Sequence, residues 1–186
     1  MQQVIAVHLA EGFEEIEAIS IIDVLRRAGF NVSVISVTGK KEVTSKQDVT
    51  VTADKLFENV DYEKIDMIVL PGGMPGAKNL KEHEALGKKI LDFYKNDKPL
   101  GAICAAPMVL GNLGILENKN ATCFPGFEDE LKGAKITGND VEVDGKIITG
   151  KGAGVAILFA LKIVEFIKGK ESADELGKRM VVPQFS

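Results

Sequence analysis

Cys104 is the residue whose type and neighbours most directly suggest chemistry. It lies within residues 100–107, where an apolar segment expected to form a strand gives way to small residues and then a helix. This arrangement presents a side chain at the tip of a sheet, above helix N–H groups that favour negative charge. A thiol there is predicted to ionise easily and to act as a nucleophile. The alternative is an inert core cysteine, because free cysteines in apolar runs are commonly buried.

A glycine-rich turn over residues 71–76 follows another apolar segment. Its spacing matches neither of the common phosphate-binding glycine patterns, so it does not indicate a nucleotide site. One interpretation is a tight turn between a strand and a helix, which glycine permits. The other is that the N–H of Gly73 points at a reacting oxygen and forms an oxyanion hole together with the N–H of Ala105.

Glu17 is the carboxyl that could act with the thiol. Glu14 and Glu15 lie at the start of a predicted helix, where the helix dipole accounts for acidic residues. Glu17 lies deeper, near the apolar side of that helix. Desolvation and the charge of a nearby thiolate would raise the pKa of such a carboxyl. Glu17 is therefore predicted to hold a proton and to donate it to the sulfur.

The remaining histidines and the second cysteine suggest less. His8 lies in an apolar run and is predicted to be a satisfied core residue, whereas His83 lies in a charged stretch expected at the surface. Cys123 is predicted to belong to the core, with a second thiol near the site as the alternative. No group of cysteines and histidines has metal-ligand spacing, so we expect neither a metal nor a cofactor.

The elements that must position these side chains alternate between strand and helix. This order predicts an α/β fold, an open and mostly parallel sheet with helices on both faces, and a site beyond the carboxyl ends of the strands. The first helix is expected to bury one broad face containing Ile16, Ile19, Ile22 and Leu25. Strands are predicted over 3–9, 31–37, 67–70 and 100–103, helices over 14–28, 84–94 and 156–167, an antiparallel excursion over 43–52 and a hairpin over 141–149.

Composition limits the classes of protein that fit. The chain has 186 residues, 45% of them hydrophobic and 27% charged, which predicts one soluble domain over residues 1–186. A net charge of -4 does not favour nucleic acid or an anionic membrane. The apolar stretch over 100–116 is broken by proline and glycines and does not predict a membrane span. Two cysteines without a signal pattern predict free thiols in a reducing cytoplasm.

Glu17 and residues 71–80, 102–107 and 151–154, taken together, resemble the ThiJ/PfpI superfamily. Within it, the chain resembles the branch containing the human DJ-one protein and bacterial protein deglycases. The resemblance implies one flavodoxin-like domain of the class I glutamine amidotransferase type, a homodimer and a reactive cysteine at a strand-to-helix elbow. It also implies that Cys104 is the nucleophile, Glu17 its protonated partner, and Gly73 and Ala105 the oxyanion donors.

Two positions depart from the family pattern in ways that affect the expected chemistry. Protease-like members place a histidine directly after the cysteine, where this chain has Ala105, so peptidase activity is not expected. The human branch has a histidine before the proline matched by Pro125, and here Phe124 takes that place. An imidazole that could serve as a base is thus missing. Gly72, Phe124 and Pro125 remain expected walls of the site.

The cations expected near the thiol also differ from those of the human branch. Arg27 matches one of two arginines, while Gln47 stands at the other position. Lys151 retains a positive charge where that branch has arginine. Arg27 and Lys151 are therefore expected as anion contacts.

Three functions are compatible with this reading. In the first, Cys104 attacks a small α-oxoaldehyde such as methylglyoxal, or its adduct on a protein, and Glu17 moves a proton between carbons. In the second, the same thiol is an oxidative-stress sensor or chaperone that forms a sulfinate held by Glu17. A thiamine-pathway role is the third, although no residue indicates thiazole binding.

Overall fold

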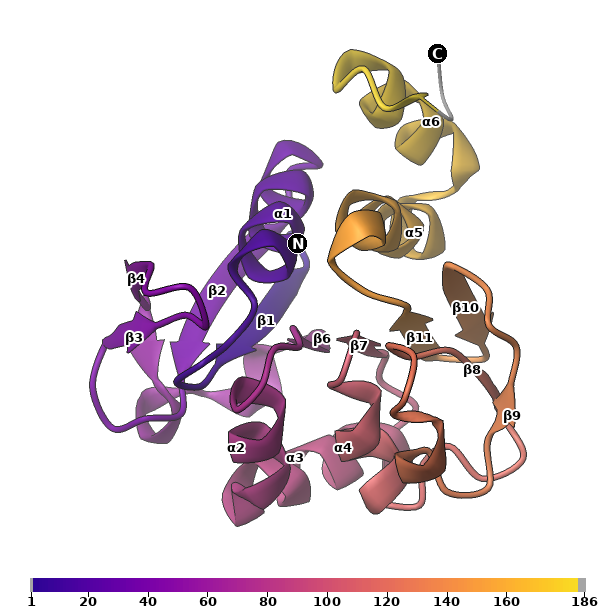
Figure 1. The fold of residues 1–186 in the computed structure, drawn as a ribbon. Coiled ribbons are helices and arrows are strands. Elements are labelled where there is room, and N and C mark those ends of the chain that lie inside the picture. The colour runs from indigo at the N-terminus through magenta and orange to yellow at the C-terminus, as the bar shows by residue number, and fades with distance from the viewer. Residues whose placement is uncertain (1, 184–186) are drawn as a thin grey trace.

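Seven strands form the central sheet of the computed structural model, which describes residues 2–183 (Figure 1). Their order across the sheet is β10-β11-β7-β6-β1-β2-β5, and all neighbours are parallel except β10 and β11. The strands are β1 (Val4–Leu9), β2 (Asn31–Ser36), β5 (Lys55–Leu56), β6 (Met67–Leu70), β7 (Leu100–Ile103), β10 (Val141–Asp144) and β11 (Ile147–Gly150). The prediction of an open, mostly parallel sheet is confirmed.

The middle strands are buried along their length, as expected when helices cover both faces of a sheet. Every residue of β6, β7 and β11 is buried. The chain runs outward from β1 to β2 and later returns to place β6 on the other side of β1. Strand order therefore reverses beside β1. Crevices that hold functional groups form at this point, beyond the carboxyl ends of the strands.

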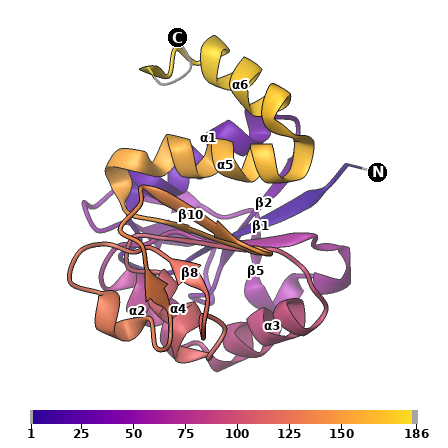
Figure 2. The same ribbon diagram turned by 90° about the vertical axis from the view of Figure 1, so that its right-hand side faces the viewer.

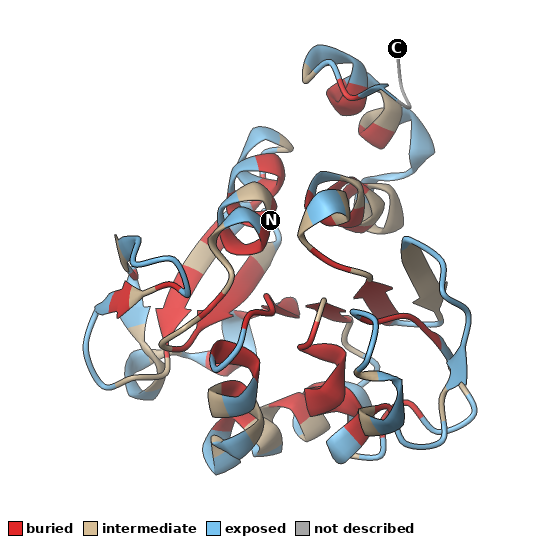
Figure 3. Ribbon diagram, viewed as in Figure 1, coloured by how far each residue is buried: buried red, intermediate tan, exposed pale blue. Residues whose placement is uncertain are grey.

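Helices form a layer on each side of this sheet (Figures 1 and 2). One layer contains α1 (Glu15–Arg27) and α5 (Ala156–Lys168), with α6 (Lys170–Arg179) packed outside α5. The opposite layer contains α2 (Gly76–Glu82), α3 (Glu84–Lys95) and α4 (Pro107–Asn112). Buried residues of the helices face the sheet, and exposed residues face outward (Figure 3). Two hydrophobic cores result, one on each face.

Short strands outside the main sheet complete the fold. Strands β3 (Glu42–Thr44) and β4 (Thr50–Thr52) pair antiparallel, and the turn between them contacts the segment before α1 through a bridge between Phe13 and Ser45. Strands β8 (Asn120–Ala121) and β9 (Lys135–Ile136) form a second small pair. The predicted antiparallel excursion and the hairpin of β10 and β11 are confirmed.

The predicted buried face of α1 is partly wrong. Ile16 and Ile19 are 57% and 45% exposed, whereas Ile22 and Leu25 are buried as expected. The helix is rotated so that Glu17 and several apolar residues nearer the sheet are buried in place of Ile16 and Ile19. Packing against β1, β2 and α5 sets this rotation. Among residues 2–183, no helix has both the length and the apolar character needed to cross a bilayer.

Candidate active site

Three chain segments meet at the carboxyl ends of β1, β6 and β7. The segment after β1 leads into α1 and carries Glu17, the turn after β6 carries Gly72 and Gly73, and the turn after β7 carries Cys104. Because β6 lies between β1 and β7, its turn lies between the segments that carry Glu17 and Cys104. The sheet therefore brings together the three motifs that the sequence singled out.

Cys104 has a strained backbone that neighbouring segments hold in place. Its φ of 65° lies in the left-handed region, which is unfavourable for a residue with a side chain. The N–H of Cys104 donates to the carbonyl of Gly150 at 2.8 Å, and the carbonyl of Cys104 accepts from the N–H of Phe124 at 2.8 Å. These bonds fix the elbow on both sides, and the thiol is left partly exposed.

Gly72 allows the carboxyl and the cysteine to approach each other. Its N–H donates to Oε2 of Glu17 at 2.7 Å. A Cβ atom built on Gly72 would lie 2.6 Å from Cβ of Cys104 and 2.8 Å from Oε2 of Glu17. Any larger residue would therefore push the two side chains apart, and Gly72 lies between Glu17 and Cys104.

The Glu17 carboxyl is buried within this wall. Desolvation raises its pKa to about 7, although hydrogen bonds from the Cys104 side chain and from Gly72 oppose the rise. Oε2 is occupied by the N–H of Gly72, whereas Oε1 is buried and has no partner in good hydrogen-bonding geometry among the described residues. Oε1 is therefore the oxygen on which a proton of this carboxyl would lie.

The start of α1 holds Glu17 at this position. The Glu14 carboxylate accepts from the N–H of Glu17 at 2.7 Å and caps the helix. The N–H of Glu14 in turn donates to the carbonyl of Gly72 at 2.9 Å. The helix dipole alone did not indicate that Glu14 caps the helix, because recognising a cap requires knowing the residue at which the helix begins. Glu14 thus links the first turn of α1 to the turn after β6.

The thiol is not ionised as easily as the sequence predicted. Burial raises the pKa of Cys104 to about 12, and the nearby Glu17 charge adds to the rise. Hydrogen bonds from the backbone N–H groups of Gly73 and Ala105 act in the opposite direction and lower this pKa. Desolvation and the carboxyl outweigh the two N–H groups, so the pKa of Cys104 is shifted upward, opposite to the direction expected from the helix N-terminus.

Gly73 is held so that its N–H can serve as one of these donors. Its φ is +88°, and a Cβ built there would lie 2.4 Å from the backbone nitrogen of Glu14. Only glycine fits such a position, since both the conformation and the contact exclude a side chain. The N–H groups of Gly73 and Ala105 come from two different turns and meet at the sulfur. An oxygen on a carbon bound to that sulfur would lie close to the same donors.

Phe124 and Pro125 are exposed residues of the loop that holds Cys104. Lys151 follows β11, but its Nζ donates to the carbonyl of Gly138 at 3.0 Å. Its ammonium group therefore serves a neighbouring loop, which leaves its predicted role as an anion contact without support. The position of Gln47 is exposed.

Arg27 is not brought to the thiol within this chain. It is the last residue of α1, about 15 Å along the helix axis from Glu17 at the usual rise per residue. It pairs with Asp23 at 2.6 Å. The prediction that Arg27 contacts the site is therefore wrong for a single chain, because Glu17 and Arg27 lie at opposite ends of one helix.

The other polar candidates have structural surroundings. Nε2 of His8 hydrogen-bonds the Tyr62 hydroxyl at 2.7 Å in the core, while Nδ1 lacks a partner among the described residues, so His8 is only partly satisfied. Nδ1 of His83 accepts from the N–H of Leu86 and caps α3, which corrects its prediction as a simple surface residue. Cys123 is buried, as predicted. Within residues 2–183, no cluster of His, Cys, Asp or Glu could hold a metal ion.

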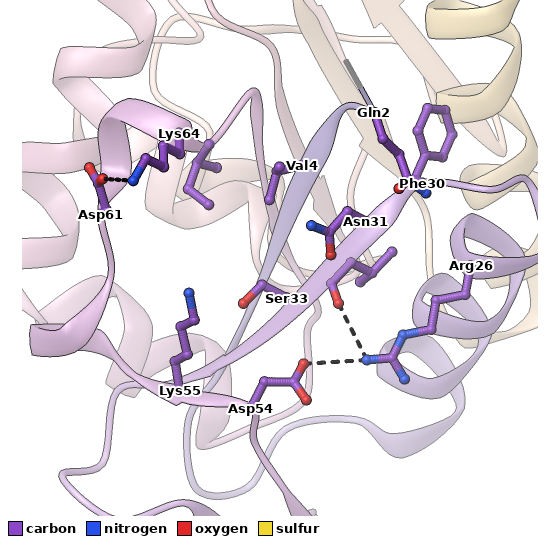
Figure 4. Close-up of a pocket in the computed structure, with 12 residues that line it drawn as sticks. Gln2, Val4, Arg26, Phe30, Asn31, Ser33, Asp54, Lys55, Asp61 and Lys64 are labelled. Carbon is purple, nitrogen blue, oxygen red and sulfur yellow. Dashed lines mark hydrogen bonds and ion pairs between the residues drawn. The ribbon is translucent and has the colours of Figure 1, made fainter.

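A surface pocket of about 640 Å³ lies far from these groups, at the amino ends of β1 and β2 (Figure 4). Two ion pairs cross its rim, between Arg26 and Asp54 at 3.3 Å and between Lys64 and Asp61 at 3.0 Å. Its charges are therefore largely paired with each other. The nucleophile, carboxyl and N–H donors all lie at the other end of the sheet, which makes that end the candidate active site.

The fold and this site define a flavodoxin-like α/β protein with a cysteine at a strand-to-helix elbow and a buried carboxyl beside it. The model of the DJ-1/PfpI family matches residues 3–166. The chain belongs to this family, which confirms the resemblance seen in the sequence.

Similar proteins agree with this assignment. Protein DJ-1 homolog B of Arabidopsis thaliana is 40% identical over 96% of this chain, and the chain spans only 41% of that protein's length. The structure of oxidised Toxoplasma gondii DJ-1 has a TM-score of 0.91 and 38% identity over 97% of this chain and 99% of that one. Glutathione-independent glyoxalase DJR-1.2 of Caenorhabditis elegans is 35% identical over 90% of both chains.

Proposed function

We propose that this protein is a cysteine-dependent enzyme that converts small α-oxoaldehydes, such as methylglyoxal, or their adducts on proteins into hydroxy acids. The observation that carries the proposal is the placement of the Glu17 carboxyl and two backbone N–H groups around the Cys104 sulfur. The name of the similar nematode glyoxalase supports the reaction class. No cofactor is required, because the reaction is an internal redox change followed by addition of water.

The first step uses the thiol and carboxyl as a pair. The Cys104 proton passes to Oε1 of Glu17, and the resulting thiolate forms a bond to the aldehyde carbon. The electron pair of the carbonyl moves onto oxygen, which the N–H groups of Gly73 and Ala105 stabilise. Glu17 then returns its proton to this oxygen and gives a hemithioacetal. Since Glu17 has a pKa of about 7, it can accept and release a proton near neutral pH.

The second step moves a proton between adjacent carbons. Glu17, again a carboxylate, takes the proton from the former aldehyde carbon, whose bonding electrons form a carbon–carbon double bond while the neighbouring carbonyl becomes an enolate oxygen. Glu17 then gives this proton to the neighbouring carbon, and the hydroxyl proton on the first carbon passes to the oxygen of the second. The product is a thioester of a 2-hydroxy acid on Cys104. Water then breaks the carbon–sulfur bond, releases the acid and restores the thiol. The net change is addition of one water to the oxoaldehyde, and no external oxidant or reductant takes part.

The proposal is tested by incubating the purified protein with methylglyoxal and measuring D-lactate and L-lactate separately. Cys104→Ser should abolish formation of either. Glu17→Gln keeps the shape of the side chain but cannot take up a proton, so turnover should fall by about 10²–10⁴-fold. Lactate formation by Cys104→Ser equal to that of the unchanged protein would refute the proposal.

Redox sensing with the same thiol is the second candidate function. The unpartnered Oε1 of Glu17 favours it, because a protonated Oε1 could donate to an oxygen on the sulfur. Two equivalents of peroxide would convert the Cys104 thiolate to a sulfinate and release two waters. Lack of turnover with any aldehyde, combined with formation of this sulfinate, would favour the sensor.

We also propose that the chain acts as a single domain and as a homodimer in the cytoplasm. Ile16 and Ile19 support the dimer, since both are large apolar residues left exposed on one helix. The partners expected are an aldehyde or a glycated protein. No observation favours nucleic acid or a membrane, and no residue indicates peptidase or thiazole chemistry.

A further inference from the structure

Phe124 is a large apolar side chain left 47% exposed beside the nucleophile. Its N–H donates to the carbonyl of Cys104, so its backbone is fixed directly against the elbow. Exposing apolar ring surface to water costs free energy, and covering it with a bound molecule recovers that free energy. Phe124 is therefore available to contact a molecule bound at the thiol, a role separate from the proposed proton transfers.

The ring spans the two loops that hold Cys104. On one side it packs against Gly152, where a built Cβ would lie 3.2 Å from Cδ2 of the ring. Gly152 follows β11, whose Gly150 accepts from the N–H of Cys104. Phe127, in the same loop, lies edge-on to the ring, with 6.4 Å between the two ring centroids. These contacts place the ring beside the loops that hold the Cys104 backbone.

The surroundings of the thiol offer little to an anionic substituent. The ammonium group of Lys151 is bonded to the carbonyl of Gly138, and Arg27 lies at the far end of α1. The carboxyl group beside the nucleophile is that of Glu17, and the charge of Lys46 interacts with the carboxylate of Glu14, which caps α1. Met74, which directly follows the N–H donor Gly73, adds another apolar side chain that is 38% exposed.

From this arrangement we infer that Phe124 determines specificity by forming an apolar wall for the substituent of the substrate. The favoured class is α-oxoaldehydes with an uncharged apolar or aromatic substituent, such as phenylglyoxal, over glyoxal. The inference rests on the proposed function and makes it more specific. One methylene in an apolar pocket is worth about 10–200-fold in selectivity, so loss of a whole ring should have a large effect.

The test compares kcat/KM for phenylglyoxal with kcat/KM for glyoxal. The unchanged protein should prefer phenylglyoxal, and Phe124→Ala should lower the ratio of the two values by about tenfold or more. Tyr94→Ala is the matched control, because Tyr94 is 41% exposed on α3 and away from the site. This control should leave the ratio unchanged. An equal ratio in the unchanged protein and Phe124→Ala would overturn the inference.

A second measurement does not depend on turnover. The rates at which N-phenylmaleimide and N-ethylmaleimide modify Cys104 are measured. Each rate is divided by the rate of the same reagent with a free small thiol, which corrects for the reagent's own reactivity. The phenyl reagent should be favoured in the unchanged protein and lose that advantage in Phe124→Ala. If no aldehyde is turned over but this difference is found, the proposed function fails while the apolar wall stands. If the two proteins show the same preference, the wall is refuted whether or not turnover occurs.

Discussion

Replacing Glu17 by Gln should remove a defined part of the pH dependence of folding. The pKa of Glu17 is raised from 4.5 to about 7 in the folded protein, mainly by desolvation. In the unfolded chain the carboxyl loses its proton near 4.5. The folded state therefore keeps a proton that the unfolded state loses between these pH values. The stabilisation linked to this proton is fully present below about 4.5 and is lost as the pH rises through about 7.

The expected size follows from the pKa change. At about 1.4 kcal/mol for each pKa unit, the shift corresponds to about 3 kcal/mol. Gln keeps an oxygen that can accept from the N–H of Gly72 but has no charge to bury. The free energy of unfolding of the unchanged protein minus that of Glu17→Gln should therefore fall by about 3 kcal/mol between pH 4 and pH 8. Cys104 does not contribute in this range, because its pKa is raised to about 12.

Urea unfolding followed by circular dichroism at several pH values measures this difference. Glu171→Gln serves as the control, since it removes an exposed carboxyl from α6 and keeps the site intact. For this control, the free energy of unfolding of the unchanged protein minus that of the variant should change little with pH. If the difference for Glu17→Gln stays constant within about 0.5 kcal/mol, the usual size of surface effects, the carboxyl is not held protonated and the reasoning fails.

Three further predictions follow from the same geometry. Iodoacetamide at pH 8 should label Cys104 before Cys123, because Cys123 is only 5% exposed. Labelling of Cys104 should be faster in Glu17→Gln, because this variant lacks the charge that raises the pKa of Cys104. Equal labelling of the two cysteines in peptide mass spectra would contradict the first expectation. Limited peroxide should add two oxygens to Cys104, and Glu17→Leu should change the products because the Oε1 donor is lost; identical product masses would argue against that contact. Gly72→Ala should lower stability by about 1–3 kcal/mol through overpacking, whereas Gly154→Ala, which meets nothing within 4 Å, should have little effect on the melting temperature.

The sequence by itself determined the local features of this protein. Alternating apolar segments and helices predicted the open parallel sheet, and the positions of strand ends placed Glu17, Gly73 and Cys104 at one edge. These predictions depend on residues close together in the chain, such as an apolar strand followed by small residues. Local propensity and hydrophobic periodicity record such features directly.

Tertiary structure decided how the side chains interact. The rotation of α1 exposes Ile16 and buries Glu17, and packing against distant strands sets that rotation. The pKa of Cys104 depends on desolvation and on Glu17, which is far from it in the sequence. The distance of Arg27 from the thiol and the bond from Lys151 to the carbonyl of Gly138 likewise follow from the folded path of the chain. Burial, charge interactions and hydrogen bonds between remote segments depend on three-dimensional proximity, which the pattern along the chain does not encode residue by residue.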